Sequence, residues 1–260
     1  MWTIGRSTPT ATGGGREVGA YNDRLLFVHI PKTGGTSIKR YLWDHLPGVR
    51  GQRPASWGDD FDSGGLPIGH VPLRDIERFT GRTPDSFERI LAVIRNPYEQ
   101  QVSQWLFWRE RYAIGHRHPH DLCAASHSDV NGWLEDPLCD FHLWYEERFS
   151  DGDPAWRKSR LPEERYATWG GFYPYWLADK TGRFPDNLQM LEFSTLADDF
   201  PGAVADFTEA AELPRMNAAT LRFPVPAYYS QRGAALVEMK FPWAFGTVYG
   251  KLDPLTLRPT

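Results

Sequence analysis

The chain has 260 residues, enough for one sizeable hydrophobic core or two small ones. Hydrophobic residues make up 41% and charged residues 24%, the ordinary balance of a soluble globular protein. The formal net charge of −4 gives no overall attraction to nucleic acid or to an anionic membrane surface. These values exclude a nucleic-acid partner held by general charge, and any anion site must be local.

The beginning of the chain and its cysteines suggest where the protein works. Residues 1–20 are rich in Gly and Thr and lack the charged start and apolar centre of a secretory signal. We therefore expect a flexible tail, followed by a single domain over residues 21–260. No run of about 18 apolar residues occurs, so no membrane span is expected. Cys123 and Cys139 are too few for a disulfide framework and lack metal-ligand spacing, which favours a reduced, cytoplasmic protein.

The first predicted unit is a strand, a tight loop and a helix. Residues 24–30, RLLFVHI, are a nearly continuous apolar run, typical of a strand buried on both faces. Apolar residues at helical spacing follow and end at Pro47 and Gly48, which predicts a helix. Residues 49–66 are then expected to be loop.

The second unit is again a strand followed by a helix. Residues 67–73 can hold a short strand and residues 75–79 a weak helix, before the buried strand RILAVI at residues 89–94. The next helix has strong start signals, since Asn96 can cap it, Pro97 takes its first position and Glu99 completes a capping box.

The rest of the chain continues the alternation. The predicted elements are helices around residues 130–134 and 141–148, a helix within 166–180, a strand at 187–193, an amphipathic helix over 195–213 and a late helix at 232–241. Strands that alternate with helices indicate an α/β fold, with a parallel sheet covered by helices on both faces.

The loop after the first strand, HIPKTGGTSI, combines features of an anion cradle. A helix start presents unpaired N–H groups and the positive end of the helix dipole. The residues that can contribute glycine backbone, hydroxyl groups or positive charge are Lys32, Thr33, Gly34, Gly35, Thr36 and Ser37. The lysine precedes the glycines, so this is not the Walker pattern. The alternative is a glycine-rich turn that binds nothing.

A second anion site is expected where the second buried strand ends. Arg95 follows that strand, at the sheet edge where ligands bind in open α/β sheets. Ser103 shares a helix face with Asn96, seven positions earlier. Arg95 and Ser103 can together reach a second phosphate. Taken alone, Arg95 is more often a structural ion-pair partner.

FVHIPKTGGTSI followed by AVIRNPYEQQVSQW resembles the 5′-phosphosulfate loop and the 3′-phosphate motif of sulfotransferases. The likeness is greatest to the carbohydrate type that includes heparan sulfate 2-O-sulfotransferase, and GHVPL is similar to that family's Gly-His segment. It is strong over about residues 24–110 and weak toward the C-terminus.

The resemblance implies a P-loop-NTPase-like three-layer sandwich with a central parallel sheet. It implies 3′-phosphoadenosine 5′-phosphosulfate (PAPS) as donor, its desulfated product adenosine 3′,5′-bisphosphate (PAP), and no metal. The 5′-phosphosulfate would lie on residues 32–37 and the 3′-phosphate on Arg95 and Ser103. Lys32 and His70 would be catalytic, with His70 as base for an acceptor hydroxyl. Residues 113–180 would be the variable, acceptor-side insertion.

Other interpretations remain open. The acceptor hydroxyl is expected to be that of a glycan, with a tyrosyl peptide or a small phenol as alternatives. A nucleotide kinase would want a lysine after the glycines and a strand-end carboxylate for Mg²⁺. A non-catalytic nucleotide-binding protein is the third class. The histidine-rich stretch suggests a metal, but without zinc-type spacing a solvated loop is the better interpretation; its members are His116, His118, His120 and His127.

Overall fold

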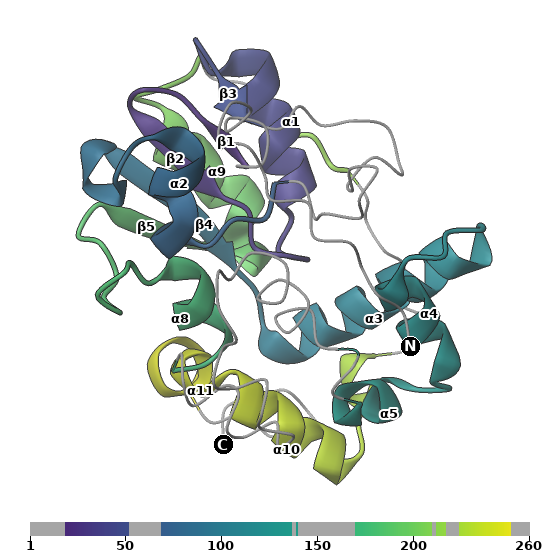
Figure 1. The fold of residues 1–260 in the computed structure, drawn as a ribbon. Helices are drawn as coiled ribbons and strands as arrows, with labels where there is room; N and C mark the ends of the chain where they lie inside the picture. Colours follow the sequence, from purple (N-terminus) through teal and green to yellow (C-terminus); the bar gives the residue numbers. More distant parts are fainter. Residues whose placement is uncertain are drawn as a thin grey trace.

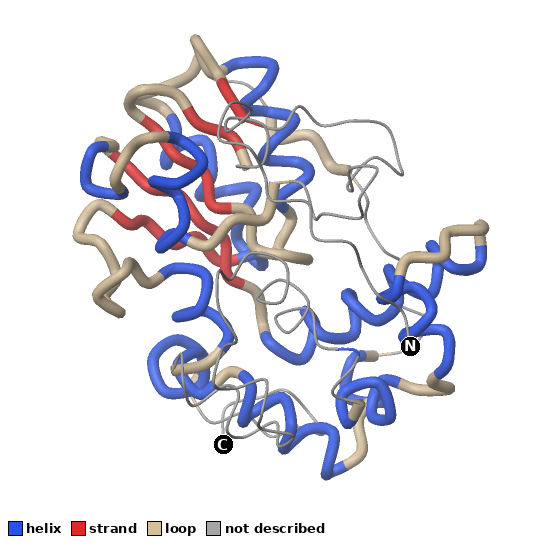
Figure 2. Tube along the Cα trace, viewed as in Figure 1, coloured by secondary structure: helices blue, strands red, loops and turns tan. Residues whose placement is uncertain are grey.

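The computed structural model of the protein describes residues 19–51, 69–136, 139, 170–209, 212–216 and 224–250. A five-stranded mixed sheet lies at the centre of the α/β fold, in the order β3-β1-β2-β4-β5 (Figures 1 and 2). The strands are β1 (Ala20–Tyr21), β2 (Leu25–Val28), β3 (Arg50–Gly51), β4 (Arg89–Ile94) and β5 (Leu188–Glu192). β2, β4 and β5 run parallel, whereas β1 is antiparallel to β2 and β3.

The three strands predicted from apolar runs are confirmed as β2, β4 and β5. The antiparallel edge was not predicted, so the sheet is mixed rather than wholly parallel. β1 includes Ala20, at the end of the expected tail, and β3 lies in the expected loop. Each has two residues, too few to show a period in the sequence. The Asn22 side chain forms the turn between β1 and β2 by accepting from the Arg24 and Leu25 amides at 2.8 Å.

Helices cover both faces of the sheet, because alternate strand residues point to opposite sides. On one face, α1 (Gly35–His45) and α9 (Leu196–Val204) pack on Phe27, Leu91 and Val93. On the other, α2 (Ile76–Thr80) and α8 (Phe172–Leu177) belong to a larger core that includes Leu26, Ala92 and Ile94. The result is three layers with apolar cores on both sides of the strands.

A group of helices extends from the carboxyl end of β4 (Figure 1). It comprises α3 (Pro97–Ala113), α4 (Pro119–Ser126), α5 (Val130–Glu135), α10 (Gln231–Lys240), α11 (Pro242–Ala244) and a π-helical turn at Phe245–Tyr249. The predicted Asn96 cap of α3 is confirmed, since Asn96 accepts from the Tyr98 and Glu99 amides. The Glu99 side chain, which was expected to complete a capping box, pairs with Arg95 instead. Single 3₁₀ turns occur at Leu73–Asp75, Pro84–Ser86, Phe193–Thr195 and Val225–Tyr228.

The aromatic residues are mainly core residues. Tyr173 and Trp176 of α8 are at most 1% exposed, as are Tyr41 and Tyr98 of the flanking helices. The run GGFYPYWL therefore packs the core rather than lining an open groove. None of the helices in the described part of the chain is long and apolar enough to cross a membrane.

Further expectations fail within the described residues. The helix expected over residues 195–213 ends at Val204. Residues 69–72 form no strand, because the chain turns there and enters the 3₁₀ turn at Leu73–Asp75. The histidine-rich stretch is also less open than a solvated loop, since it holds the start of α4. The helix expected at residues 141–148 lies outside the described residues.

Candidate functional site

The loop between β2 and α1 has a special backbone. Lys32 has a φ of +63°, the only positive φ of a non-glycine residue in the described ranges. Gly34 caps α1 with a φ of +86° and, as glycine, offers no side chain to the helix start, whose first turn contains no acidic residue. Non-glycine residues in this left-handed region are uncommon and cluster at functional sites. The start of α1 therefore presents amide groups and the positive end of its dipole without a competing carboxylate.

The loop side chains differ in what they can offer a ligand. Lys32 is half-buried, with its Nζ 3.8 Å from the centroid of the Phe107 ring on α3. Thr33 is fully buried and its Oγ1 donates to the Ile30 carbonyl at 2.9 Å, so it holds the loop rather than a ligand. Thr36 is half-buried at the first turn, and Ser37 is buried behind it.

The segment at residues 212–216 reaches the same loop. The Met216 amide donates to Ser37 Oγ at 3.0 Å, although the two residues are 179 positions apart. The Ser37 hydroxyl keeps its own proton to donate. The chain thus reaches the cradle immediately before residues 217–223, which lie outside the described residues.

Arg95 reaches the loop from the neighbouring strand. β2 and β4 are adjacent and parallel, so their carboxyl ends meet at one edge of the sheet. Arg95 Nη1 donates to the Lys32 carbonyl at 3.2 Å and Nε to Glu99 at 3.2 Å, and the guanidinium lies 4.2 Å from the Phe193 ring centroid. The structure therefore brings the two predicted cationic residues together.

Two residues that sequence reasoning missed hold this arrangement. Gln100 is fully buried, and its Nε2 donates to the Pro31 carbonyl at 2.7 Å. The Tyr173 hydroxyl lies 2.7 Å from the Arg95 amide and 2.9 Å from Gln100 Oε1. Burial raises the pKa of Tyr173 well above its usual value, so its hydroxyl stays protonated. Gln100 and Tyr173 carry no sequence signal, since their partners depend on how α3 and α8 pack.

His70 lies against the first loop from the other side. Its Nδ1 is 2.7 Å from the His29 carbonyl, and the rings of His29 and His70 are 4.0 Å apart. A ring nitrogen facing a carbonyl carries the proton, so Nε2 holds the lone pair that a general base needs. The structure thus places the predicted base beside the loop of Lys32.

Ser103 is less clearly part of the site. It is 4% exposed and lies one turn beyond Gln100 on α3. Among the described residues, no hydrogen bond joins Ser103 to Arg95 or to the first loop. Its predicted role in phosphate binding remains a prediction.

His29 packs the inside of the loop. Its side chain is buried, and a Cβ atom added to Gly35 would lie 1.8 Å from His29 Cδ2. Burial holds the pKa of His29 well below its usual value, and the nearby charges of His70, Lys39 and Lys32 lower it further. His29 is therefore neutral in the folded protein at neutral pH, as expected of a packing residue.

This neutral histidine predicts a pH dependence of stability. Below about pH 6.5 the unfolded chain protonates His29 and the folded chain does not, so the free energy of unfolding should fall toward acid pH. The slope contributed by this one group should approach about 1.4 kcal/mol per pH unit. Urea denaturation between about pH 7.5 and about pH 5 measures it, with His29→Gln for comparison. Equal slopes in the two proteins would remove His29 as the cause.

The cysteines correct an expectation. Cys123 and Cys139 form a disulfide, with Cα atoms 5.5 Å apart, instead of two separate reduced thiols. They meet because the chain reverses through α5, which lies between them. His127 Nε2 lies 3.1 Å from Asp136 Oδ2 in the same place.

His118 and His120 of the rich stretch serve α4. His118 caps the helix, while the Asp121 carboxylate accepts from the His118 amide at 2.9 Å. His120 is buried, and its ring lies 5.1 Å from that of Trp108. Asp121 also pairs with Arg111 at 3.1 Å. These contacts explain His118 and His120 as helix capping and packing between α3 and α4.

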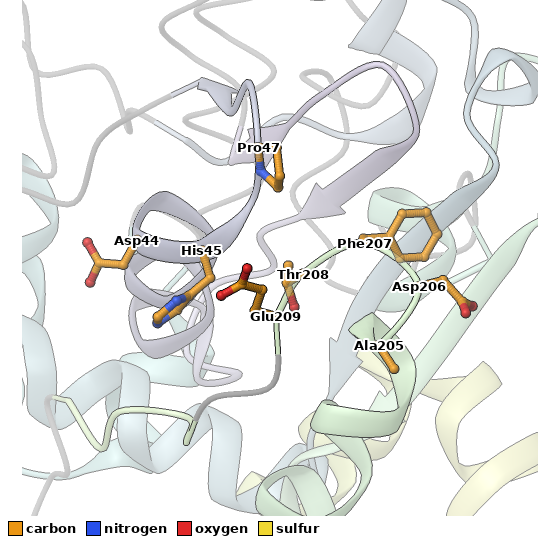
Figure 3. A pocket seen from close by; sticks show the side chains of 8 residues that line it. All are labelled: Asp44, His45, Pro47, Ala205, Asp206, Phe207, Thr208 and Glu209. Carbon is orange, nitrogen blue, oxygen red and sulfur yellow. The ribbon is translucent and has the colours of Figure 1, made fainter.

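A pocket of about 340 Å³ lies at the opposite end of α1 (Figure 3). It is lined by Asp44, His45 and Pro47 and by residues 205–209. Three of its lining residues are acidic, which does not suit an anionic nucleotide. An 11-residue helix is roughly 16 Å long, so this pocket is separate from the cradle at the start of α1.

Comparison with known proteins gives no relative. The chain matches no known family model, no curated protein sequence and no solved structure. The function therefore has to be argued from Lys32, His70 and Arg95 and the contacts that hold them.

Proposed function

We propose that the protein is a sulfotransferase that moves a sulfuryl group from PAPS to an acceptor hydroxyl, with a glycan hydroxyl as the first candidate. The observation that carries the proposal is the 3.2 Å bond from Arg95 Nη1 to the Lys32 carbonyl. It joins the Arg95 guanidinium to the backbone of Lys32 at neighbouring strand ends, and His70 faces the His29 carbonyl at the start of the same loop. A donor with phosphate groups at its 3′ and 5′ positions needs two such anion sites close together.

The proposed reaction uses each residue in one step. The acceptor oxygen forms a bond to sulfur as the bond from sulfur to the 5′-phosphate oxygen breaks. Lys32 and the start of α1 stabilise the charge on the leaving phosphate, and His70 Nε2 takes the acceptor proton. Arg95 binds the 3′-phosphate, in this proposal together with Ser103. In-line placement of donor and acceptor supplies the remaining rate acceleration.

The P-loop-NTPase-like fold is part of the same proposal. It is supported by the parallel β2-β4-β5 core, by a loop from β2 into the helix start of α1, and by helices on both faces.

A phosphotransferase is the second candidate because of Glu192. This residue ends β5 at the same sheet edge and can supply the carboxylate that Mg²⁺ requires. The position of Lys32 before the glycines still favours a sulfate donor over a triphosphate. The cytoplasmic location expected from the sequence remains a proposal, and the disulfide argues against a permanently reducing setting.

Ligand stabilisation separates the candidates. PAP at about 100 times its Kd should stabilise the folded chain by about 2.7 kcal/mol, and AMP, which lacks the 3′-phosphate, should do far less. Arg95→Ala should abolish the difference between the two nucleotides. Equal or greater stabilisation by ATP–Mg²⁺ would favour the phosphotransferase. The acceptor is then identified by transfer of labelled sulfate from PAPS to a panel of glycans, phenols and peptides.

A further inference from the structure

Four metal-ligating side chains gather between α4 and α5, away from the cradle. They are Cys123, His127, Asp136 and Cys139, and one ligand atom of each lies within 4.8 Å of all the others. His127 Nε2 is 3.1 Å from Asp136 Oδ2, and Cys123 Sγ is 4.0 Å from the same oxygen. Cys139 is 2% exposed, and the other three are half-buried.

The position of each ligand follows from the local fold. Cys123 is in the last turn of α4 and His127 follows the end of that helix, four positions later. Asp136 follows α5, and the Cys139 amide donates to the Asp136 carbonyl at 3.0 Å. The pairs C-x₃-H and D-x₂-C are therefore brought together by one reversal of the chain. The spacing of the four residues in the sequence did not reveal that they meet.

The elements that carry the ligands are held from outside the cluster. Within α5, Asn131 donates to the Tyr228 carbonyl at 3.1 Å and so ties the helix to the segment before α10. In α4, Asp121 is fully buried and pairs with Arg111 at 3.1 Å. The scaffold therefore does not depend on the sulfur–sulfur bond alone. Reduction is expected to release the sulfurs while α4 and α5 stay in place.

We propose that this cluster is a redox-gated Zn²⁺ site: a disulfide when oxidised, and a four-ligand zinc site when reduced. Two thiolates, an imidazole and a carboxylate are a donor set that zinc takes in tetrahedral geometry. With Zn–S bonds of about 2.3 Å, the two sulfurs must separate to roughly 3.8 Å. The Asp136 and His127 atoms already have the separation of two ligands of one ion. A disulfide alone needs neither group beside it.

The chemistry balances with a thiol or phosphine as reductant. Two electrons and two protons break the sulfur–sulfur bond and give two thiols. A thiol reductant becomes a disulfide, and a phosphine becomes a phosphine oxide whose oxygen comes from water. Zn²⁺ then displaces both thiol protons, so binding releases two protons. Oxidation by a low-molecular-weight disulfide reverses the sequence and releases the metal.

The test titrates the full chain with Co²⁺, a spectroscopic substitute for Zn²⁺, after reduction by a phosphine and without reduction. The reduced chain should bind one Co²⁺ with tetrahedral visible bands and a thiolate-to-metal charge-transfer band, and Zn²⁺ should displace it. The oxidised chain should show neither band. Binding without the charge-transfer band, or equal binding by both forms, would overturn the proposal.

Variants test the two non-sulfur ligands. His127→Gln and Asp136→Asn roughly keep the side-chain size. Loss of a group that only supports a metal ligand usually weakens metal binding by about 10- to 100-fold, so each of these ligand variants should weaken Zn²⁺ binding by that factor or more. His45→Gln, an exposed histidine at the far end of α1, is the matched control and should bind as the wild type does. Unchanged Zn²⁺ affinity in both ligand variants would show that the cluster is only a disulfide and holds no zinc. Circular dichroism verifies that each variant folds.

Discussion

His70→Ala should lower kcat for sulfuryl transfer by about 10²- to 10⁴-fold, the usual contribution of a positioned general base. The reason is the bond between His70 Nδ1 and the His29 carbonyl at 2.7 Å, which leaves the basic lone pair on Nε2. PAP binding should stay within about twofold, because the proposed base contacts the acceptor rather than the nucleotide. Single-turnover transfer of labelled sulfate and PAP titration measure the two quantities separately.

A second variant separates proton transfer from packing. Asn can donate to the His29 carbonyl as the imidazole does but has no basic nitrogen, so His70→Asn should be nearly as inactive as His70→Ala. His45→Ala is the control. If His70→Asn keeps most of the activity, His70 is a positioning residue and another group is the base.

The parts of the fold that could be predicted depend on local signals. β2 and β4 are continuous apolar runs, and the start of α3 is fixed by Asn96 within three residues of chain. The short strands β1 and β3 depend instead on the Asn22 turn, on the edge that β2 offers to β1, and on the edge that β1 offers to β3. Two-residue strands leave no periodic signal, so the mixed edge of the sheet could not be read from sequence.

In the candidate site, too, some features follow from local motifs and others depend on contacts between distant residues. The proximity of Lys32 and Arg95 follows from two motifs at the ends of neighbouring parallel strands, a placement that sequence alone can anticipate. The supports at Gln100, Tyr173 and Met216 depend on pairs of residues 69 to 179 positions apart. Such pairs are fixed only when the helices dock. The meeting of the cysteines belongs to the same class, because it depends on the reversal through α5.

Gly35→Ala should destabilise the protein by about 1–3 kcal/mol, the usual cost of overpacking a core. Helix propensity alone favours alanine by about 0.5–1 kcal/mol. The expected decrease in the free energy of unfolding therefore comes from packing. The new Cβ would lie 1.8 Å from His29 Cδ2 and 2.1 Å from its Nε2. His29 has little room to move, since the rings of Phe27 and His70 lie 5.9 Å and 4.0 Å from its own.

A matched glycine isolates the packing contribution. Gly202 in α9 has nothing within 4 Å of an added Cβ, so Gly202→Ala should raise the free energy of unfolding by about 0.5–1 kcal/mol. Urea denaturation of both variants gives the comparison, and PAP titration shows whether the displaced loop also loses its ligand. If Gly35→Ala is as stable as Gly202→Ala, the loop can accommodate the added Cβ and the close contact with His29 does not destabilise the protein. A stable Gly35→Ala that loses PAP binding would mean that the loop gives way at the cradle itself, since His29 supports the loop that carries Lys32.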